Sequence, residues 1–289
     1  MKQDLIATSA PICSKTVHAA GCGCHRADEF LRVPTEIYNA SRRDFLRKAV
    51  LGGAMVAALP MLAAEQAQAD IFRPSQSDQQ KQGDAAAAQV LQKYHEINDS
   101  RARSVQNVGA KLINALTPKE RGPWNYRFHL IDSKEVNAFA LPGGNLFFFT
   151  GLVDRIKSSD ELAGVMGHEI THVRREHWAR QIATMTKQQL GVGLLLGAVH
   201  AGQGWQSVAG GLESLYSLKF SRGDEDEADA KGLDDMVRAG YDPHGMLDLF
   251  NTLLAASGGK ESGPGFLSDH PLTKDRIKKT EQRIAKLRR

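Results

Sequence analysis

The sequence predicts an α+β fold that is mostly helical and contains one small sheet. Apolar residues recur at helical spacing over most of the chain beyond residue 85, whereas alternating apolar residues occupy only two short neighbouring stretches. The 289 residues suffice for one sizeable domain and an extension, and the 42% hydrophobic and 24% charged residues are typical of globular proteins. We therefore expect one mixed domain in which helices outnumber strands.

The charge and the cysteine content exclude several classes of protein. The net charge of +4 is small and spread along the chain, without a basic stripe interleaved with aromatic residues, so nucleic acid is not an expected partner. Cys13, Cys22 and Cys24 all fall in the first 25 residues, so no disulfide can stabilise the main domain. The thiols and the histidine of residues 21–25 lie too close together to complete a tetrahedral metal site, which favours an unstructured leader.

Residues 41–70 have the three-part layout of an export signal. The stretch SRRDFL at 41–46 resembles the twin-arginine signal, which implies export of a folded protein to the bacterial periplasm. The apolar run at 49–64 is shorter than the ~20 residues needed to cross a bilayer, so we expect a removed signal and no spanning segment in the mature chain. Cleavage is expected after Ala69, which would leave a mature chain without cysteine, as suits an oxidising compartment.

The chain therefore divides into three expected parts. Residues 1–69 form the extension and the signal, residues 70–84 are a polar lead-in that we expect to be flexible, and residues 85–289 form the domain. Within the domain, helical spacing up to about Leu116 predicts one long helix or two shorter ones. Alternation over 124–132 and 137–151, with a Pro-Gly-Gly turn in the second stretch, predicts a strand followed by a β-hairpin.

Helices are predicted over most of the remaining chain. Ser158 and the acids that follow it predict the start of a helix that we expect to continue at least to Arg180. The apolar stretch 190–199 is too short to span a membrane, and we interpret it as a buried helix, with dipping into a membrane surface as the alternative. Further helices are expected within residues 214–240, after Tyr241-Asp242-Pro243, and from about Thr273 to the end.

The helix that begins at Ser158 carries the segment HEITH at 168–172. Residues four apart lie on one face of a helix, so His168 and His172 present two imidazoles to one point, with Glu169 beside it. Zinc accepts such nitrogen ligands, and a nearby carboxylate can take a proton from water at the metal. The apolar residues around the motif predict a buried helix, where unpartnered histidines would be costly, so solvated histidines are the weaker interpretation.

A third metal ligand must come from elsewhere in the chain. The continuation HExxHxxGxxH is absent, because Arg175 and Trp178 stand where glycine and histidine are required. His177 is about half a turn around the helix from the motif, so we expect it to face elsewhere and to bond a carbonyl or an acid.

The acidic cluster at 224–229 offers candidate carboxylates on a later helix. The alternative interpretation is that these acids form a solvated face of the helix. It is weakened because Glu225 lies on a predicted buried stripe. Asp229, one turn later, could accept a hydrogen bond from a ligand histidine. The stripe is formed by Ala228, Leu233, Met236 and Val237.

Four blocks occur in order: NAFALPGGNLFFFTGLV, ELAGVMGHEITHVRREH, SRGDEDEADAKG and SDHPLTKDRI. Together they resemble the M48 family of zinc metallopeptidases over roughly residues 100–280, and the soluble periplasmic branch in particular. The resemblance implies a zincin-like α+β domain with an HExxH active-site helix and one zinc ion per chain. It assigns His168, His172 and Glu225 as metal ligands, Glu169 as general base, and Asp229 as the acid that orients a histidine.

The resemblance also implies two further parts of the active site. A peptide substrate would lie along an edge strand through main-chain hydrogen bonds. His270 and Arg276 resemble a histidine and an arginine near the active site, where His270 would bind the oxyanion or occupy the open position of the metal. The residues of the edge strand are Asn137, Ala138, Phe139 and Ala140.

The expected function is that of a zinc-dependent metalloendopeptidase of the bacterial periplasm. Its substrates would be misfolded or unassembled proteins of the cell envelope. The alternative from a different class is a periplasmic chaperone or assembly factor with a latched centre and little proteolysis. An amidase or esterase is the third interpretation, which the predicted edge strand disfavours.

Overall fold

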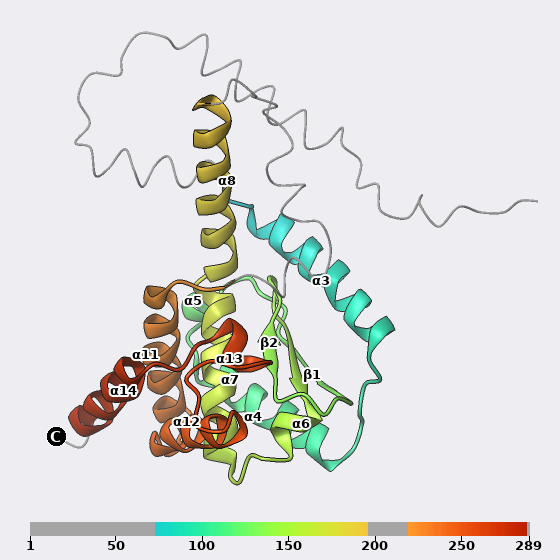
Figure 1. The fold of residues 1–289 in the computed structure, drawn as a ribbon. Coiled ribbons are helices and arrows are strands. Elements are labelled where there is room, and N and C mark those ends of the chain that lie inside the picture. The colour runs from blue at the N-terminus through green and yellow to red at the C-terminus, as the bar shows by residue number, and fades with distance from the viewer. Residues whose placement is uncertain (1–72, 196–218, 288–289) are drawn as a thin grey trace, which may run out of the picture. The chain divides into compact units, whose positions relative to one another are not determined.

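In the computed structural model of the protein, the described residues are 73–195 and 219–287, and the side chains of 189–195 are not described. The three cysteines, the predicted signal with its cleavage site, and residues 196–218 lie outside this part of the chain. The described elements in chain order are α3 (Gln76–Lys93), α4 (Ser100–Ala115), α5 (Pro118–Arg121), β1 (Arg127–Ile131), β2 (Ala138–Ala140), β3 (Asn145–Phe149), α6 (Thr150–Val153), α7 (Ser159–Arg174), α8 (His177–Leu195), α11 (Arg222–Arg238), α12 (His244–Ala256), α13 (Phe266–Asp269) and α14 (Lys274–Leu287) (Figure 1). The predicted α+β class is confirmed.

The sheet is small and mixed. Its strand order is β1-β3-β2, with β1 parallel and β2 antiparallel to the central strand β3. The predicted hairpin is confirmed, and its turn uses Gly143 and Gly144 at positive φ angles of 86° and 112°, a region that favours glycine. This topology leaves β2 at an edge of the sheet.

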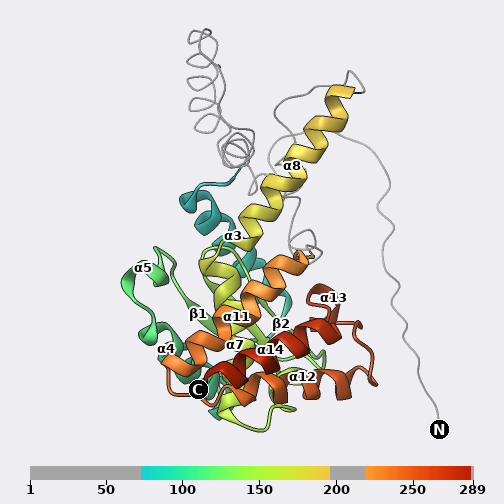
Figure 2. The ribbon, with the colours of Figure 1, turned by 90° about the vertical axis from the view of Figure 1, so that its left-hand side faces the viewer.

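Helix α7 is the centre of the domain, because α4, α11, α12 and β2 all pack against it. It lies between the sheet and helix α11 (Figures 1 and 2). The largest hydrophobic cluster surrounds it, and 13 of its 16 residues are buried. A second cluster fills the space between α3 and the other face of the sheet. Helices therefore cover both faces of the three strands, and α7 is enclosed on every side.

Helices α7 and α11 touch backbone to backbone at a pair of glycines. A Cβ atom on Gly232 would lie 2.8 Å from the carbonyl carbon of Gly167 and 2.8 Å from the backbone nitrogen of His168. No side chain fits there without moving the helices, because real Cβ contacts are longer. This contact sets the distance between the HEITH motif and the acidic helix.

The structure differs from the sequence prediction at the lead-in. Residues 76–84, expected to be flexible, belong to α3, which is capped by the Ser75 hydroxyl accepting from the backbone N–H of Asp78. Gln79 and Gly83 are buried, and Gly83 packs directly on the carbonyl of Pro142 in the hairpin turn. Tertiary packing of a polar, small-residue face thus makes this segment helical, and composition alone does not reveal it.

The expectation that the active-site helix continues to Arg180 is wrong. Helix α7 ends at Arg174, and Glu176 adopts the left-handed conformation with a φ of 52° before α8 begins. The Glu176 carboxylate accepts a hydrogen bond from Gln79 at 2.8 Å and pairs with Arg73 at 3.0 Å. Contacts from the N-terminal segment therefore hold a break that local propensity does not favour.

The helices predicted within 214–240, after Tyr241-Asp242-Pro243 and from about Thr273 are found as α11, α12 and α14, whereas α8 was not predicted as a separate helix. The short helices α5, α6 and α13 were not predicted, because one turn carries too little periodic pattern. None of the described helices is both long enough and apolar enough to cross a membrane. The interpretation of 190–199 as a buried helix falls on residues whose burial is not described.

A surface ion pair gives a prediction for acid stability. Arg238 donates to both carboxylate oxygens of Glu120, at 2.8 and 2.7 Å, and Thr117 donates to the same group. These hydrogen bonds lower the pKa of Glu120 from 4.5 to about 2. The stability that Glu120 contributes is therefore present above pH 4.5 and is lost as the pH falls towards 2. Because the pair is largely exposed, salt should weaken it.

We expect Glu120→Gln to lower the free energy of unfolding at pH 7 and to leave it unchanged near pH 2. Urea unfolding at several pH values measures the difference, and Glu281→Gln, on the exposed face of α14, is the matched control. A difference between Glu120→Gln and wild type that stays constant from pH 7 to pH 2 would contradict the assignment.

Candidate metal centre

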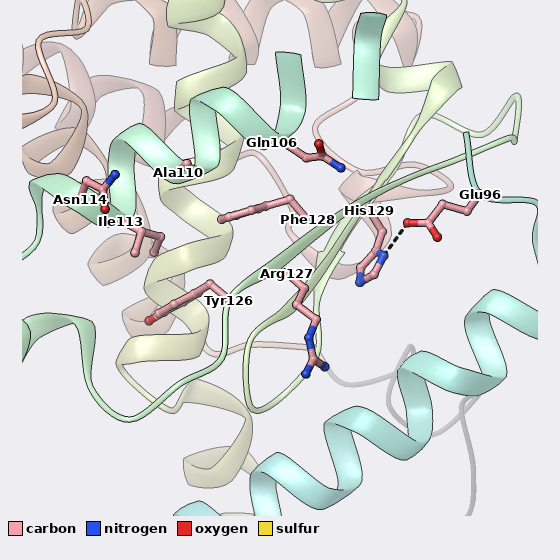
Figure 3. Close-up of a pocket in the computed structure, with 9 residues that line it drawn as sticks. All are labelled: Glu96, Gln106, Ala110, Ile113, Asn114, Tyr126, Arg127, Phe128 and His129. Atoms are coloured by element: carbon pink, nitrogen blue, oxygen red, sulfur yellow. Dashed lines mark hydrogen bonds and ion pairs between the residues drawn. The ribbon is translucent and has the colours of Figure 1, made fainter. Parts of the chain in front are cut away.

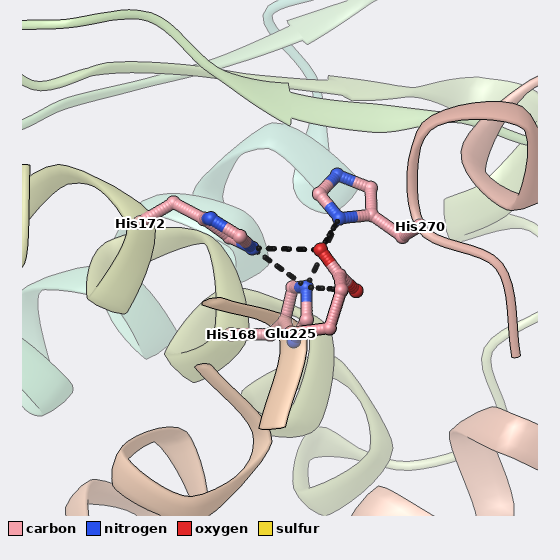
Figure 4. Close-up of side chains that lie close together, drawn as sticks. All are labelled: His168, His172, Glu225 and His270. Atoms are coloured by element: carbon pink, nitrogen blue, oxygen red, sulfur yellow. Dashed lines mark hydrogen bonds and ion pairs between the residues drawn. The ribbon is translucent and has the colours of Figure 1, made fainter. Parts of the chain in front are cut away.

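Four side chains from three parts of the chain converge in the interior (Figure 4). His168 and His172 come from α7, Glu225 from α11, and His270 from the residue that follows α13. Each offers one ligand atom, and these atoms all lie within 4.8 Å of one another. All four side chains are buried, at no more than 3% exposure. The sequence predicted each of these residues near the metal, and the fold brings them together.

The donor set fits a zinc ion. The Nε2 atoms of His168 and His172 are 3.0 Å apart and face the same point. The carboxylate of Glu225 faces that point from the opposite helix, with Oε1 3.5 Å from His172 Nε2 and Oε2 3.6 Å from His168 Nε2. Two imidazoles and one carboxylate, with a further position beside them, are the ligands typical of a catalytic zinc.

Asp229 and Arg276 lie behind the candidate ligands. His168 Nδ1 is 3.0 Å from Asp229 Oδ1, which sets the other ring nitrogen, Nε2, towards the centre. Arg276 donates to both oxygens of Asp229 at 2.7 Å and pairs with Glu225 Oε2 at 2.7 Å. Burial alone would raise the pKa of Asp229, but the Arg276 charge outweighs it and holds that pKa well below its usual range. Asp229 is therefore an ionised acceptor for His168.

Glu169 lies beside the cluster and is not one of its four members. Its carboxylate is buried and accepts a hydrogen bond from the backbone N–H of Ala140, while its Oε1 has no hydrogen-bond partner among the described residues. Burial raises the pKa of Glu169, so its carboxylate holds a proton more readily than one in water. A buried carboxylate oxygen without a hydrogen bond, 3.5 Å from His270 Nε2, is free of a donor that would compete for a proton from water.

His270 lies against the same centre. Its Nδ1 is 2.8 Å from Glu225 and 3.2 Å from His168 Nε2, and its Nε2 is 3.5 Å from Glu169 Oε1. Burial opposes a charge on this ring, but Glu225 and Glu169 outweigh the burial and raise the pKa of His270 to about 9. The ring is stacked between Phe220 and Phe266, with centroid distances of 5.5 and 4.6 Å. Sequence reasoning missed these two aromatic residues, because neither belongs to a spaced motif.

The predicted substrate strand is β2. Asn137, Phe139 and Leu141 pair with β3, so the backbone groups of Ala138 and Ala140 point away from the sheet. The Phe139 side chain packs against Phe147 in the cluster beneath α3, on the face of the sheet away from the centre.

The segment that leads to His270 contacts the same edge. The backbone N–H of Phe266 donates to the carbonyl of Val136, the residue two before Ala138 on the outward-facing side. Gly265 lies so close that a Cβ atom on it would be 2.5 Å from that carbonyl oxygen. One short stretch of chain, 265–270, thus touches both the end of the edge strand and the centre.

The predicted orientation of His177 is wrong. The break at Glu176 turns the chain so that His177, fully buried, places its Nδ1 2.9 Å from His172 Nδ1. Its Nε2 is 3.3 Å from Glu227, so the expected bond to an acid is confirmed.

The predicted buried stripe of the acidic helix is wrong at one position. Val237 was placed on this stripe but is 38% exposed, whereas Asp235 is buried and pairs with Arg174.

A separate hollow lies between α4 and β1 (Figure 3). None of its nine lining residues belongs to the centre. The His129–Glu96 pair, at 2.7 Å, closes one end of it. The lining residues are Glu96, Gln106, Ala110, Ile113, Asn114, Tyr126, Arg127, Phe128 and His129.

A buried helix with two histidines four residues apart, an acid beside them, and a carboxylate from a facing helix define the class of HExxH metal-dependent hydrolases. Residues 99–284 match the model of peptidase family M48. The chain belongs to this family.

Three curated relatives illustrate the similarity. A beta-barrel assembly-enhancing protease of Yersinia pestis is 29% identical, over 64% of this chain and 39% of the relative. The mitochondrial metalloendopeptidase OMA1 of Schizosaccharomyces pombe is 35% identical, over 54% of this chain and 46% of the relative. The metalloprotease LoiP of Escherichia coli K12 is 31% identical, over 60% and 68%. The chain thus spans less than half of the first two relatives and about two thirds of the third.

Proposed function

We propose that the protein is a zinc-dependent metalloendopeptidase that hydrolyses peptide bonds of misfolded or unassembled proteins in the bacterial cell envelope. The observation that carries the proposal is the convergence of His168, His172 and Glu225 beside Glu169, inside a domain of a peptidase family. One zinc ion per chain would be held by the two histidines and Glu225. The names of the relatives, which are proteases and metalloendopeptidases, support the same reaction.

The chemistry follows from the residues around the centre. A bound zinc ion would supply a Lewis acid that acidifies water and polarises the scissile carbonyl. Glu169 takes the proton of the attacking water and passes it to the leaving amine, a task that its raised pKa favours. The N–H of Ala140 holds the Glu169 carboxylate in place, and Asp229 holds His168. These residues position and move protons, and the substrate carbonyl is oriented by the strand along which it lies.

The substrate is proposed to be an extended peptide that adds to the free edge of β2. The outward-facing N–H and C=O of Ala138 and the C=O of Ala140 support this mode, because they match the main-chain pattern of an added strand, while the Ala140 N–H donates to Glu169. Such binding requires a stretch of chain without structure of its own. Unfolded or unassembled proteins meet that requirement, whereas compact folded proteins do not.

The proposed location is the periplasm, reached through the twin-arginine signal. The layout of residues 41–70 supports it, together with the names of bacterial relatives that act in the assembly of β-barrels. The 190–199 stretch remains a proposed point of contact with a membrane surface.

The His270 side chain is proposed to latch the centre. Its Nδ1 is 2.8 Å from Glu225 and its Nε2 is 3.5 Å from Glu169, so we expect the ring to cover the position needed for water and substrate. We expect His270→Ala to increase casein cleavage several-fold, because the closed state would no longer compete with substrate. Initial rates at equal zinc content measure the change, with His244→Ala as the exposed control. A large fall in rate would instead indicate that His270 binds the oxyanion.

The proposed function is tested by metal analysis combined with a casein digest. We expect the purified protein to contain one zinc ion per chain and to cleave unfolded casein. Removing the metal with a chelator should abolish cleavage, and adding zinc should restore it. Cleavage that persists after complete metal removal would refute the mechanism.

The second candidate is a chaperone or assembly factor with little proteolysis. It is favoured by one observation, the burial of the whole centre under His270. This candidate predicts that Glu169→Gln rescues a deletion strain as well as wild type does, whereas the peptidase proposal predicts no rescue.

A further inference from the structure

The two candidate ligand histidines have different partners behind them. His168 contacts a carboxylate directly, through Asp229 at 3.0 Å. His172 contacts a second histidine, His177, at 2.9 Å between the two Nδ1 atoms, and His177 in turn contacts Glu227 at 3.3 Å. A carboxylate therefore contacts His168 directly, whereas the nearest comparable carboxylate contacts His172 only through His177.

With a metal on His172 Nε2, the contacts allow one arrangement of protons. His172 directs Nε2 towards the centre, 3.0 Å from His168 Nε2, so a ligand His172 must carry its proton on Nδ1. That N–H donates to His177 Nδ1, which must then be unprotonated. His177 consequently carries its own proton on Nε2, where Glu227 accepts it. The hydrogen-bonded series is therefore the Glu227 carboxylate, His177, His172 and then the metal position.

The ion pairs at the end of the chain agree with this arrangement. Glu227 pairs with Arg175 at 2.5 Å and with Arg180 at 2.9 Å, so two cations hold its carboxylate where it accepts from His177.

The backbone break places His177 where it can act. An uninterrupted helix would carry this residue about half a turn away from His172. The left-handed Glu176, held by Gln79 and Arg73, returns the chain instead, and Phe220 stacks on the His172 ring at 4.0 Å from its other side. His177 is fully buried in this position.

We propose that His177, backed by Glu227, is a positioning residue that fixes the tautomer and orientation of His172 for metal binding. The proposal rests on the proposed zinc site. It assigns a function to the break between α7 and α8 and to the α3 residue that holds it. His177 itself touches neither the metal position nor the substrate strand.

The test is zinc affinity, measured by chelator competition. Removing an outer partner of a ligand histidine typically weakens metal binding about 10–100-fold, and we expect this for His177→Ala. His177→Gln should recover most of the loss, because its amide can accept from His172 and donate to Glu227. Glu227→Gln, which keeps the shape, should lose less than His177→Ala. His244→Ala, at the start of α12, is the matched control and should bind zinc as wild type does.

A second readout reports the tautomers directly. Nitrogen NMR of the zinc-loaded protein should show the His177 proton on Nε2 and the His172 proton on Nδ1. Wild-type affinity in His177→Ala, or a His177 proton on Nδ1, would overturn the positioning role while leaving the zinc site intact. Failure of the wild-type protein to bind zinc would overturn the proposed function as well, so the two failures are distinguishable.

Discussion

Replacing Glu169 by glutamine is expected to reduce peptide hydrolysis by about 10²–10⁴-fold, the usual contribution of a positioned general base. Glutamine keeps the size of the side chain and can still accept the Ala140 N–H, so the local structure should persist. It cannot take a proton from water. Because Glu169 is not among the four converging ligand atoms, zinc content should remain that of wild type.

The measurement is the initial rate of casein cleavage alongside the zinc content of the same samples. Glu281→Gln, at an exposed site on α14, controls for the loss of one negative charge. A Glu169→Gln protein that retains zinc and cleaves at the wild-type rate would show that Glu169 is not the base. A variant that loses its zinc would instead place Glu169 among the ligands.

Replacing Arg276 by methionine is expected to destabilise the metal-free protein by about 3–5 kcal/mol, the cost of removing one partner from a buried ion pair. Arg276 is 5% exposed and neutralises Asp229 and Glu225, each 3% exposed. Methionine fills similar space but leaves buried Asp229 without its cation, while Glu225 keeps its contact with His270. The same change should also loosen the orientation of His168, because Asp229 would lose the group that holds it.

Urea unfolding of metal-free wild-type and variant proteins measures this effect. Arg283→Met is the matched control, since Arg283 lies on the same helix and donates to the backbone carbonyl of Asp226 at 3.2 Å. We expect saturating zinc to recover part of the lost stability, because a bound cation offsets the Glu225 charge and stabilises the folded state. A loss below about 1 kcal/mol without metal would show that the carboxylates find other partners or become protonated.

Local sequence patterns predicted much of the fold. Ser158 and the acids after it defined the start of α7, the alternating stretches defined all three strands, and Pro-Gly-Gly defined the hairpin turn. Each of these signals is contained within a few residues. The HEITH spacing likewise predicted that His168 and His172 share one helix face, because that geometry is a property of the helix itself.

The features that sequence reasoning missed depend on contacts between distant parts of the chain. The break at Glu176 is held by Gln79, 97 positions earlier, and nothing in the local residues signals it. Because the break was missed, His177 was placed on the wrong side of the helix. The helical start of α3 and the aromatic pair Phe220 and Phe266 were missed for the same reason: packing, and not propensity, selects them.

The glycine contact between α7 and α11 has a consequence for how the candidate ligands can be displaced. Gly167 and Gly232 leave no side chain between the two backbones, so the helices are at the van der Waals limit and cannot come closer. Any side chain added at either glycine would therefore push the helices apart and carry Glu225 away from His168 and His172. A tetrahedral ion with ligand bonds near 2.0–2.2 Å tolerates little of that displacement. Two residues that contribute no ligand atom would thus set the closest approach of the ligands on the two helices.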